Sequence, residues 1–145
     1  MAQEGGKWVS TPEGRHLAGR VSQDTAPEKA LRRAIHAQGA RFRMHRTLAP
    51  GCTPDLVLPK HRLAVFVDGC FWHSCPEHGR SVAWAGPNAS LWAAKMLANT
   101  TRDERSSAAA VRLGWTVVRV WEHEVMQDPV ATATRILDAA ASRPN

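Results

Sequence analysis

The stretch RLAVFVD, residues 62–68, decides the fold class of this chain. From Leu63 to Val67 every residue is apolar, whereas a strand with one solvated face alternates apolar and polar side chains. An uninterrupted apolar run is typical of a central strand that is buried on both faces. Helices must then cover both sides of the sheet, and we expect an α/β sandwich.

Two further extended segments precede this strand, ARFRMHR at 40–46 and PDLVLP at 54–59. Short turns separate the three segments, so we expect them to pair as an antiparallel meander. The first segment alternates arginine with Phe42 and Met44, which is the pattern of an edge strand. The strand at 62–68 then takes a central position.

A helix is expected over 26–38, within DTAPEKALRRAIHAQG. Asp24 or Thr25 can cap its start, and Gly39 can close its end in a left-handed conformation. Apolar residues recur at helical spacing between these ends, so one side of the helix is expected to be buried.

The second half of the chain predicts a long helix that ends at Gly114, a buried strand at 115–121 and a C-terminal helix opened by Asp128 and Pro129. The long helix is then a crossover connection between two neighbouring strands, which makes them parallel. The expected fold is a single α/β domain with a central mixed sheet flanked by helices.

The length and charge of the chain narrow its class. At 145 residues it has room for one ordinary domain, and we expect an arm or short helix over 1–23 and a folded domain over 24–145. The net charge is +6, and residues 1–50 carry nine Lys or Arg against four Asp or Glu. This asymmetry favours a polyanionic partner, because basic side chains release the counterions condensed on phosphates. Charge alone also fits a solvated basic surface.

Membrane and disulfide classes are not favoured. The chain has no run of 18 apolar residues and no apolar signal core, so we expect a cytoplasmic protein without a membrane partner. Its three cysteines are an odd number, which argues against a disulfide framework and leaves thiolates available as metal ligands. Cys52 lies apart from the other two and is assigned no role.

The segment DGCFWHSCPEH, residues 68–78, places two cysteines and two histidines directly after the central strand. Three of them have a spacing that a loop can fold around tetrahedral zinc, namely Cys70, Cys75 and His78. The fourth ligand is left open, because His123 follows the last strand and His73 lies within the loop itself. A closed site of this kind is structural; the competing interpretation is a set of buried thiols and histidines without metal.

Two carboxylates end neighbouring strands. Asp55 begins the strand at 54–59 and Asp68 ends the next one, so antiparallel pairing brings them together as an oxygen-rich pocket suited to magnesium. His73 is a candidate general base, because the ordinary pKa of a histidine lies near neutrality. Glu28 is separated from Thr25 by the spacing of a capping box, so a structural role competes with a catalytic one.

Five blocks, taken together, resemble the very-short-patch-repair (Vsr) endonuclease family from about residue 10 to 137: DTAPEKALRRAIHAQGARFRMH, PGCTPDLVLP, AVFVDGCFWHSCPEHG, NASLWAAKMLANTTRDE and LGWTVVRVWEHE. DGCFWHSCPEH is the most specific of these motifs. The resemblance implies a restriction-endonuclease-like fold of the PD-(D/E)xK type. It also implies magnesium-dependent nicking of one DNA strand beside a T:G mismatch that arises when 5-methylcytosine is deaminated.

The resemblance also assigns roles within the site. Asp55 corresponds to the family's metal-binding aspartate, Val67 to the residue whose backbone carbonyl contacts the metal, His73 to the catalytic histidine and Glu28 to an active-site glutamate. The implied zinc ligands are Cys70, Cys75, His78 and His123. This assignment selects His123 as the fourth zinc ligand and leaves His73 for the reaction.

DNA contacts are expected from two sources. The resemblance implies an aromatic wedge that enters the duplex beside the mismatch, formed by Phe71, Trp72 and Trp92. An apolar side chain between base steps costs a few kcal/mol of unstacking, and a mismatch lowers that cost. Without the resemblance, a tryptophan on a helix is more often a core residue. Helical spacing also places three polar residues toward phosphates, Lys95, Asn99 and Arg102.

The chain departs from the family pattern at a few positions. Val67 and Asp68 stand where threonine and histidine are usual, so a second carboxylate replaces a histidine, and Leu91 stands where phenylalanine is usual. The order of Cys and His among the zinc ligands is also changed. These departures put metal binding in question more than the type of reaction.

Two alternatives compete with a mismatch-nicking enzyme. One is a zinc-containing DNA-binding module without catalysis, and the other is a nuclease of the same fold with a different target. The basic N-terminal half fits all three, so the carboxylates and His73 discriminate between them. Nicking one strand requires only a monomer, and mismatch-repair proteins are candidate partners.

Overall fold

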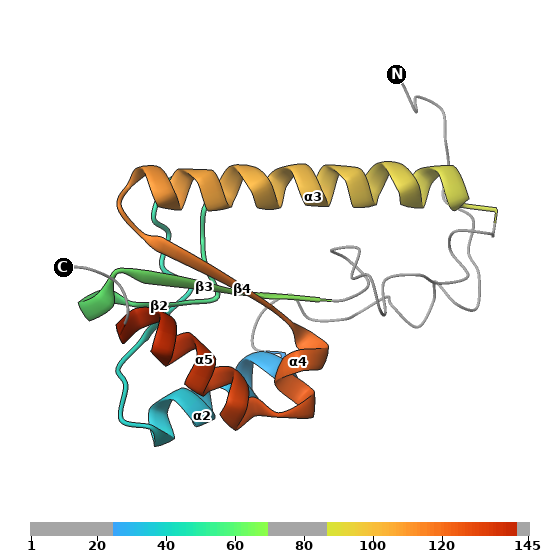
Figure 1. Ribbon diagram of the computed structural model, residues 1–145. Helices are drawn as coiled ribbons and strands as arrows, with labels where there is room; N and C mark the ends of the chain where they lie inside the picture. Colours follow the sequence, from blue (N-terminus) through green and yellow to red (C-terminus); the bar gives the residue numbers. More distant parts are fainter. Residues whose placement is uncertain (1–24, 70–86, 142–145) are drawn as a thin grey trace.

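The computed structural model describes residues 25–69 and 87–141 of the chain (Figure 1). The expected arm at 1–23 lies outside this part. Within it the elements follow the order α2 (Ala26–Ala37), β1 (Arg43–Met44), β2 (Leu56–Leu58), a 3-10 turn (Pro59–His61), β3 (Leu63–Asp68), α3 (Ala89–Arg112), β4 (Thr116–Trp121), α4 (Glu122–Gln127) and α5 (Pro129–Ala141).

The described strands form one mixed sheet in the order β1-β2-β3-β4. β1 pairs with β2 and β2 with β3 in antiparallel orientation, as the meander predicted. β3 and β4 are parallel, with Leu63 opposite Thr116 and Asp68 opposite Trp121. The predicted mixed sheet is therefore confirmed, and it is consistent with a restriction-endonuclease-like fold.

Both faces of β3 are largely buried, as its apolar run predicted. Alternate residues of β3, such as Leu63 and Val65, pack with α2, α4 and α5 in the larger core, while Ala64 and Phe66 pack in a smaller core with α3. Figure 1 shows α3 on one side of the sheet and the other three helices on the opposite side. Because successive side chains of a strand point to opposite faces, β3 contributes to both hydrophobic cores.

Helix ends agree with the predicted signals. Thr25 caps α2 through its side-chain oxygen, and α2 ends at Ala37, one residue earlier than expected. Gly39 and Gly114, which follow α2 and α3, both have a φ of 90°, a conformation that glycine adopts without a steric penalty. The turns that return the chain to the sheet therefore begin where the sequence placed them.

Two elements differ from expectation. The segment 40–46 contributes only two paired residues, Arg43 and Met44, both exposed, because the strand lies at the edge and pairs with a partner of three residues. The helix α4 was not predicted. Its start carries none of the usual capping residues; instead, the Glu124 carboxylate accepts a hydrogen bond of 2.8 Å from the backbone N–H of Trp121.

The longest described helix is α3, with 24 residues. Its buried residues recur every three to seven positions and face the rest of the protein: Trp92, Met96, Asn99, Ser106 and Ala110. The remaining surface of the helix is largely polar or small. None of the helices in the described ranges combines the length and apolar character needed to cross a membrane.

Candidate metal centre

Three metal-ligating side chains converge at the edge of the sheet near β1. Glu28 comes from the first turn of α2, His45 directly follows β1, and Asp55 directly precedes β2. One ligand atom of each lies within 4.8 Å of the ligand atoms of the other two. Within residues 25–69 and 87–141, no other group of three or more His, Cys, Asp or Glu side chains is close enough to hold one ion.

The cap of α2 positions Glu28. The Glu28 backbone N–H donates to the Thr25 hydroxyl at 3.4 Å, and that hydroxyl donates to Oε2 of Glu28 at 3.3 Å. Oε1 lies 4.0 Å from Arg32 Nη1, and Glu28 as a whole is only 4% exposed. Thr25 therefore caps α2, and its hydroxyl holds the Glu28 carboxylate, which also belongs to the metal-ligating group.

Asp55 joins this group to the end of the central strand. Its Oδ2 accepts a hydrogen bond of 2.7 Å from the backbone N–H of Val67, so the predicted approach of the two strand ends is confirmed. The pKa of Asp55 is raised to about 6, with burial as the largest cause; the nearby Glu28 and Asp68 charges add to the rise, and the Val67 hydrogen bond and His45 oppose it. This part of the protein therefore concentrates negative charge.

His45 is a member of the group that sequence reasoning missed. Its backbone is left-handed, with a φ of 50°, and its N–H donates to the Asp55 carbonyl at 3.2 Å. The Nε2 atom is buried and lies 3.9 Å from Oε1 of Glu28. The available signal was its position at the end of the alternating segment 40–46, where a polar residue that closes an edge strand is free to face a site.

Asp68 lies in a different electrostatic environment from Asp55. Its Oδ1 accepts a hydrogen bond of 2.9 Å from Nη1 of Arg119 on β4. Arg119 also donates to the side chains of Ser106 and Ser107 and to the Asp103 carbonyl, all on α3, and its guanidinium lies 4.0 Å from the centre of the Phe66 ring. Asp68 therefore has a cationic partner and is outside the group of three.

The group of three fits a divalent cation. Carboxylate oxygens suit magnesium and manganese, and an imidazole nitrogen suits transition metals. Glu28 and Asp55 would hold such an ion through oxygen, and His45 through nitrogen. The donor set contains no thiolate, so it does not resemble a structural zinc site.

Most of the Cys/His segment cannot be compared with the structure. Cys70, Phe71, Trp72, His73, Cys75 and His78 lie outside the described residues. His123 is described: it lies in the first turn of α4, two residues after Trp121, which pairs with Asp68 at the end of β3. Cys52 is fully buried, and its thiol donates to the Ser106 carbonyl at 3.2 Å.

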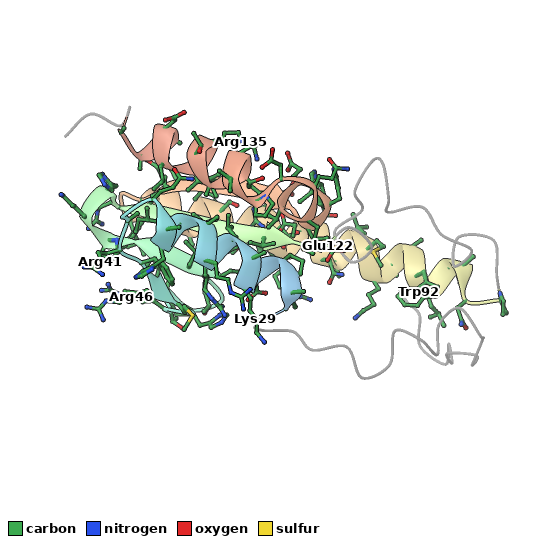
Figure 2. The ribbon with its side chains drawn as sticks, turned by 90° about the horizontal axis from the view of Figure 1, so that it is seen from below. Lys29, Arg41, Arg46, Trp92, Glu122 and Arg135 are labelled. Atoms are coloured by element: carbon green, nitrogen blue, oxygen red, sulfur yellow. The ribbon has the colours of Figure 1, made fainter. Side chains whose placement is uncertain are left out.

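The residues predicted to contact DNA on α3 differ in exposure. Lys95 and Arg102 are exposed, Asn99 is 7% exposed and Trp92 is 9% exposed. Figure 2 shows Trp92 toward the end of α3 that extends away from the sheet. The two cations are therefore open to phosphates in this structure, whereas Asn99 and Trp92 are covered.

A basic surface lies near the metal-ligating group. Lys29 and Arg46, which directly follow Glu28 and His45 in the sequence, are exposed, as is Arg41. In the view of Figure 2 these three side chains lie along one side of the protein, and Arg135 of α5 lies on the other. Exposed positive charge at Lys29 and Arg46 thus directly follows two residues of the metal-ligating group in the sequence.

Comparison with known proteins finds relatives that act on DNA. The family described as DNA mismatch endonuclease Vsr matches residues 9–78. The type II nicking enzyme V.XorIIP of Xanthomonas oryzae pv. oryzae is 44% identical over 120 residues, which cover 81% of this chain and 85% of that protein. V.NaeI, a type II nicking enzyme of Lentzea aerocolonigenes, is 39% identical over 127 residues, or 85% of this chain and 75% of the relative.

The DNA mismatch endonuclease Vsr of Escherichia coli K12 is 35% identical over 102 residues, which cover 70% of this chain and 64% of that protein. Together with the fold, these matches define the class of the protein as a strand-nicking endodeoxyribonuclease that acts in DNA mismatch repair. Within that class, the chain belongs to the Vsr family of DNA mismatch endonucleases. Its partner is DNA, and the matches support a nicking enzyme rather than a binding module without catalysis.

Proposed function

We propose that this enzyme nicks one strand of duplex DNA beside a T:G mismatch produced by deamination of 5-methylcytosine, and that it requires magnesium to do so. The observation that carries this proposal is the group formed by Glu28, His45 and Asp55 at the sheet edge of a chain that belongs to the Vsr family. Its action on DNA implies a cytoplasmic location, and nicking of one strand is consistent with a monomer.

Asp55 is proposed to hold the magnesium ion with the backbone carbonyl of Val67. When bound, a divalent ion neutralises the phosphate and lowers the pKa of its water. The Val67 N–H fixes Asp55 Oδ2, so the carboxylate keeps one orientation while its other oxygen is available as a ligand. Glu28, buried behind the α2 cap, is proposed to share this centre.

Asp68 is proposed to act on the centre as a neighbouring negative charge. Its carboxylate is oriented by Arg119, and its charge contributes to the raised pKa of Asp55. This role accommodates the substitution of aspartate for the usual histidine at this position. His73 is proposed as the general base that accepts a proton from the attacking water.

Zinc is proposed as a structural ion held by Cys70, Cys75, His78 and His123. The position of His123 supports this proposal, because β3 and β4 end at the same edge of the sheet and His123 follows β4 directly. A closed site of four such ligands would fasten the chain that leaves β3 to the start of α4.

The mismatch is proposed to be read by an aromatic wedge of Phe71, Trp72 and Trp92. Trp92 is largely buried in this structure, so its entry into DNA requires a rearrangement around the first turns of α3. Lys95, Asn99 and Arg102 are proposed to contact phosphates, and the exposed Lys95 and Arg102 are the stronger candidates.

The deciding experiment uses a duplex with one T:G mismatch in a methylcytosine context and a matched T:A duplex. We expect a single nick in the mismatched strand with magnesium, none with EDTA, and little cutting of the matched duplex, as resolved on a denaturing gel. Cleavage of the matched duplex at the same rate would favour the alternative of another DNA target. Full activity of Asp55→Ala would remove the proposed centre.

Metal analysis tests the zinc proposal separately. About one zinc ion per chain is expected in the purified protein. Cys70→Ala and His123→Ala should each lower the zinc content and the thermal unfolding midpoint, because such a metal contributes to folding. Unchanged zinc content in both variants would contradict the assigned ligands.

A further inference from the structure

His45 brings an imidazole nitrogen to a centre otherwise made of oxygen donors. Its Nε2 is buried and lies 3.9 Å from Oε1 of Glu28, and both residues belong to the group with Asp55 whose ligand atoms are within 4.8 Å of one another. None of the roles assigned above to Asp55, Val67, Asp68 or Glu28 requires this nitrogen.

The backbone holds His45 in this position. The β1–β2 pairing sets Met44 opposite Leu56, so the next residue along β1 and the preceding residue on β2 are His45 and Asp55. The His45 N–H donates to the Asp55 carbonyl, and the left-handed backbone of His45 ends the strand at this point. The backbone of His45 is thus held beside Asp55, the residue proposed as the principal ligand.

A charged histidine that forms ion pairs with the two carboxylates is the simpler explanation to be tested. The separation of 3.9 Å from Nε2 to Oε1 is too long for a hydrogen bond. Two donors that each bind one ion at about 2.0 to 2.2 Å are separated by no more than about 4.4 Å. The 3.9 Å between His45 Nε2 and Glu28 Oε1 therefore fits two ligands of one shared ion. The ligand atom of Asp55, the third donor, lies within 4.8 Å of the other two, so at most small side-chain rotations would bring it within about 4.4 Å of both.

We infer that Glu28, His45 and Asp55 together bind one divalent transition-metal ion, with Nε2 of His45 as a direct ligand, and that this nitrogen makes the site prefer Mn²⁺ over Mg²⁺. The inference deepens the proposed function, on which it rests for the location of the nuclease centre. Magnesium keeps its water and favours oxygen ligands, whereas transition metals accept imidazole readily.

Manganese is a suitable probe because it discriminates between the two metal sites proposed for this protein. Thiolates select zinc, whereas Mn²⁺ favours oxygen-rich sites, so added Mn²⁺ should leave a Cys/His zinc site intact. The purified full-length protein, without DNA and with its zinc retained, is titrated with Mn²⁺. Electron paramagnetic resonance of the unbound ion gives the affinity, and ¹⁴N modulation of the bound ion reports a histidine ligand.

We expect one bound Mn²⁺ per chain with ¹⁴N modulation. His45→Ala should lose that modulation and bind Mn²⁺ at least about tenfold more weakly, because removing a ligand should cost no less than removing its supporting contact. Competition of Mn²⁺ with Mg²⁺ should show that the Mg²⁺ affinity of His45→Ala differs from that of the wild type by less than about threefold. The matched control is His36→Ala, which removes an exposed histidine from α2 and should bind as the wild type.

His73→Ala decides whether the nitrogen signal comes from the proposed general base instead. Loss of the modulation in His73→Ala and its retention in His45→Ala would overturn the inference, as would wild-type Mn²⁺ affinity in His45→Ala. Circular dichroism checks that each variant is folded. If His45→Ala does not fold, His45→Gln replaces it, and wild-type Mn²⁺ affinity in that variant would equally overturn the inference.

Failure here is distinguishable from failure of the proposed function. Metal binding is measured without DNA, whereas the proposed function is measured by nicking of the T:G duplex. Wild-type Mn²⁺ binding by His45→Ala, with magnesium-dependent nicking intact, would remove His45 as a ligand and leave the mismatch activity. Loss of Mn²⁺ binding in His45→Ala, with no mismatch nicking by the wild type, would leave the metal site and remove the mismatch target.

Discussion

Asp55 and Asp68 lie at adjoining strand ends, but their surroundings differ. Around Asp55 the structure gathers a second buried carboxylate and an imidazole, and burial raises the pKa of Asp55 to about 6. Around Asp68 it places Arg119, whose guanidinium is itself held by hydrogen bonds to α3 and by the Phe66 ring. Asp55 thus lies in a region that accumulates negative charge, whereas the charge of Asp68 is neutralised by Arg119.

This difference separates stabilising residues from reactive ones. A buried carboxylate with a well-placed cation contributes to the fold, and removing either partner is costly. A buried carboxylate whose neighbours are also negative weakens the fold unless a cation binds there, which is the condition expected of a metal centre. Four predictions test the distinction.

The largest effect on stability is expected from Arg119→Ala. It removes the guanidinium from Asp68, whose side chain is only 10% exposed, and should lower the unfolding free energy by about 3 to 5 kcal/mol in urea denaturation. Arg135→Ala is the matched control, because Arg135 pairs with Glu124 at 3.1 Å but is 55% exposed. That variant should lose no more than about 1 kcal/mol. Equal losses in the two variants would contradict the contrast.

Asp55→Asn should have the largest effect on activity. The amide keeps the size of the side chain and can still accept from Val67, but it is a poor ligand, so nicking should fall at least about a hundredfold. Asp68→Asn should lose about tenfold or less, because it retains a hydrogen-bond acceptor for Arg119. Initial rates on the T:G duplex measure both, with Asp138→Asn on the exposed side of α5 as the control. A larger loss in Asp68→Asn would reverse the assignment.

The pH dependence of stability should also reflect Asp55. Because its pKa rises from 3.8 to about 6 on folding, the unfolded chain loses this proton first, and folding becomes less favourable as the pH rises between these values. In buffer without added divalent metal, Asp55→Asn should therefore match the wild type near pH 4. Above pH 6 it should be more stable by about 2 to 3 kcal/mol. A stability difference between Asp55→Asn and the wild type that stays constant from pH 4 to above pH 6 would show that the buried charge of Asp55 is not its cause.

The smallest effect is expected from Thr25→Ala. It removes the α2 cap and the hydroxyl that holds Oε2 of Glu28, and should cost about 1 kcal/mol of unfolding free energy. Thr25→Ser, which keeps the hydroxyl, should retain most of that stability. If alanine and serine behave alike in thermal denaturation, the hydroxyl does not support Glu28.

Local patterns were sufficient for much of the fold. The apolar run in β3 predicted two buried faces, and the crossover length predicted its parallel pairing with β4. Asp55 was found because its strand end is defined by a nearby turn. These features depend on neighbouring residues along the chain, which a single sequence displays directly.

Residues joined through space were harder to find. Arg119 reads as one polar residue in an apolar strand, and its bonds reach residues up to 51 positions away. His45 becomes informative only when β1 pairs with β2 and α2 places Glu28 beside it. The helix α4 was missed because no capping side chain precedes it. Instead, Glu124 within the helix accepts a hydrogen bond from the backbone N–H of Trp121.

Glu28, His45 and Asp55 all precede the central strand, whereas every residue proposed to read the DNA follows it. The three residues of the metal-ligating group and the residues proposed to read the DNA are therefore inherited through separate stretches of one short gene, with the proposed general base His73 in the second stretch. Substitutions after Asp68 could then redirect a lineage of nicking enzymes to new sequences while the ion-binding stretch is passed on unaltered.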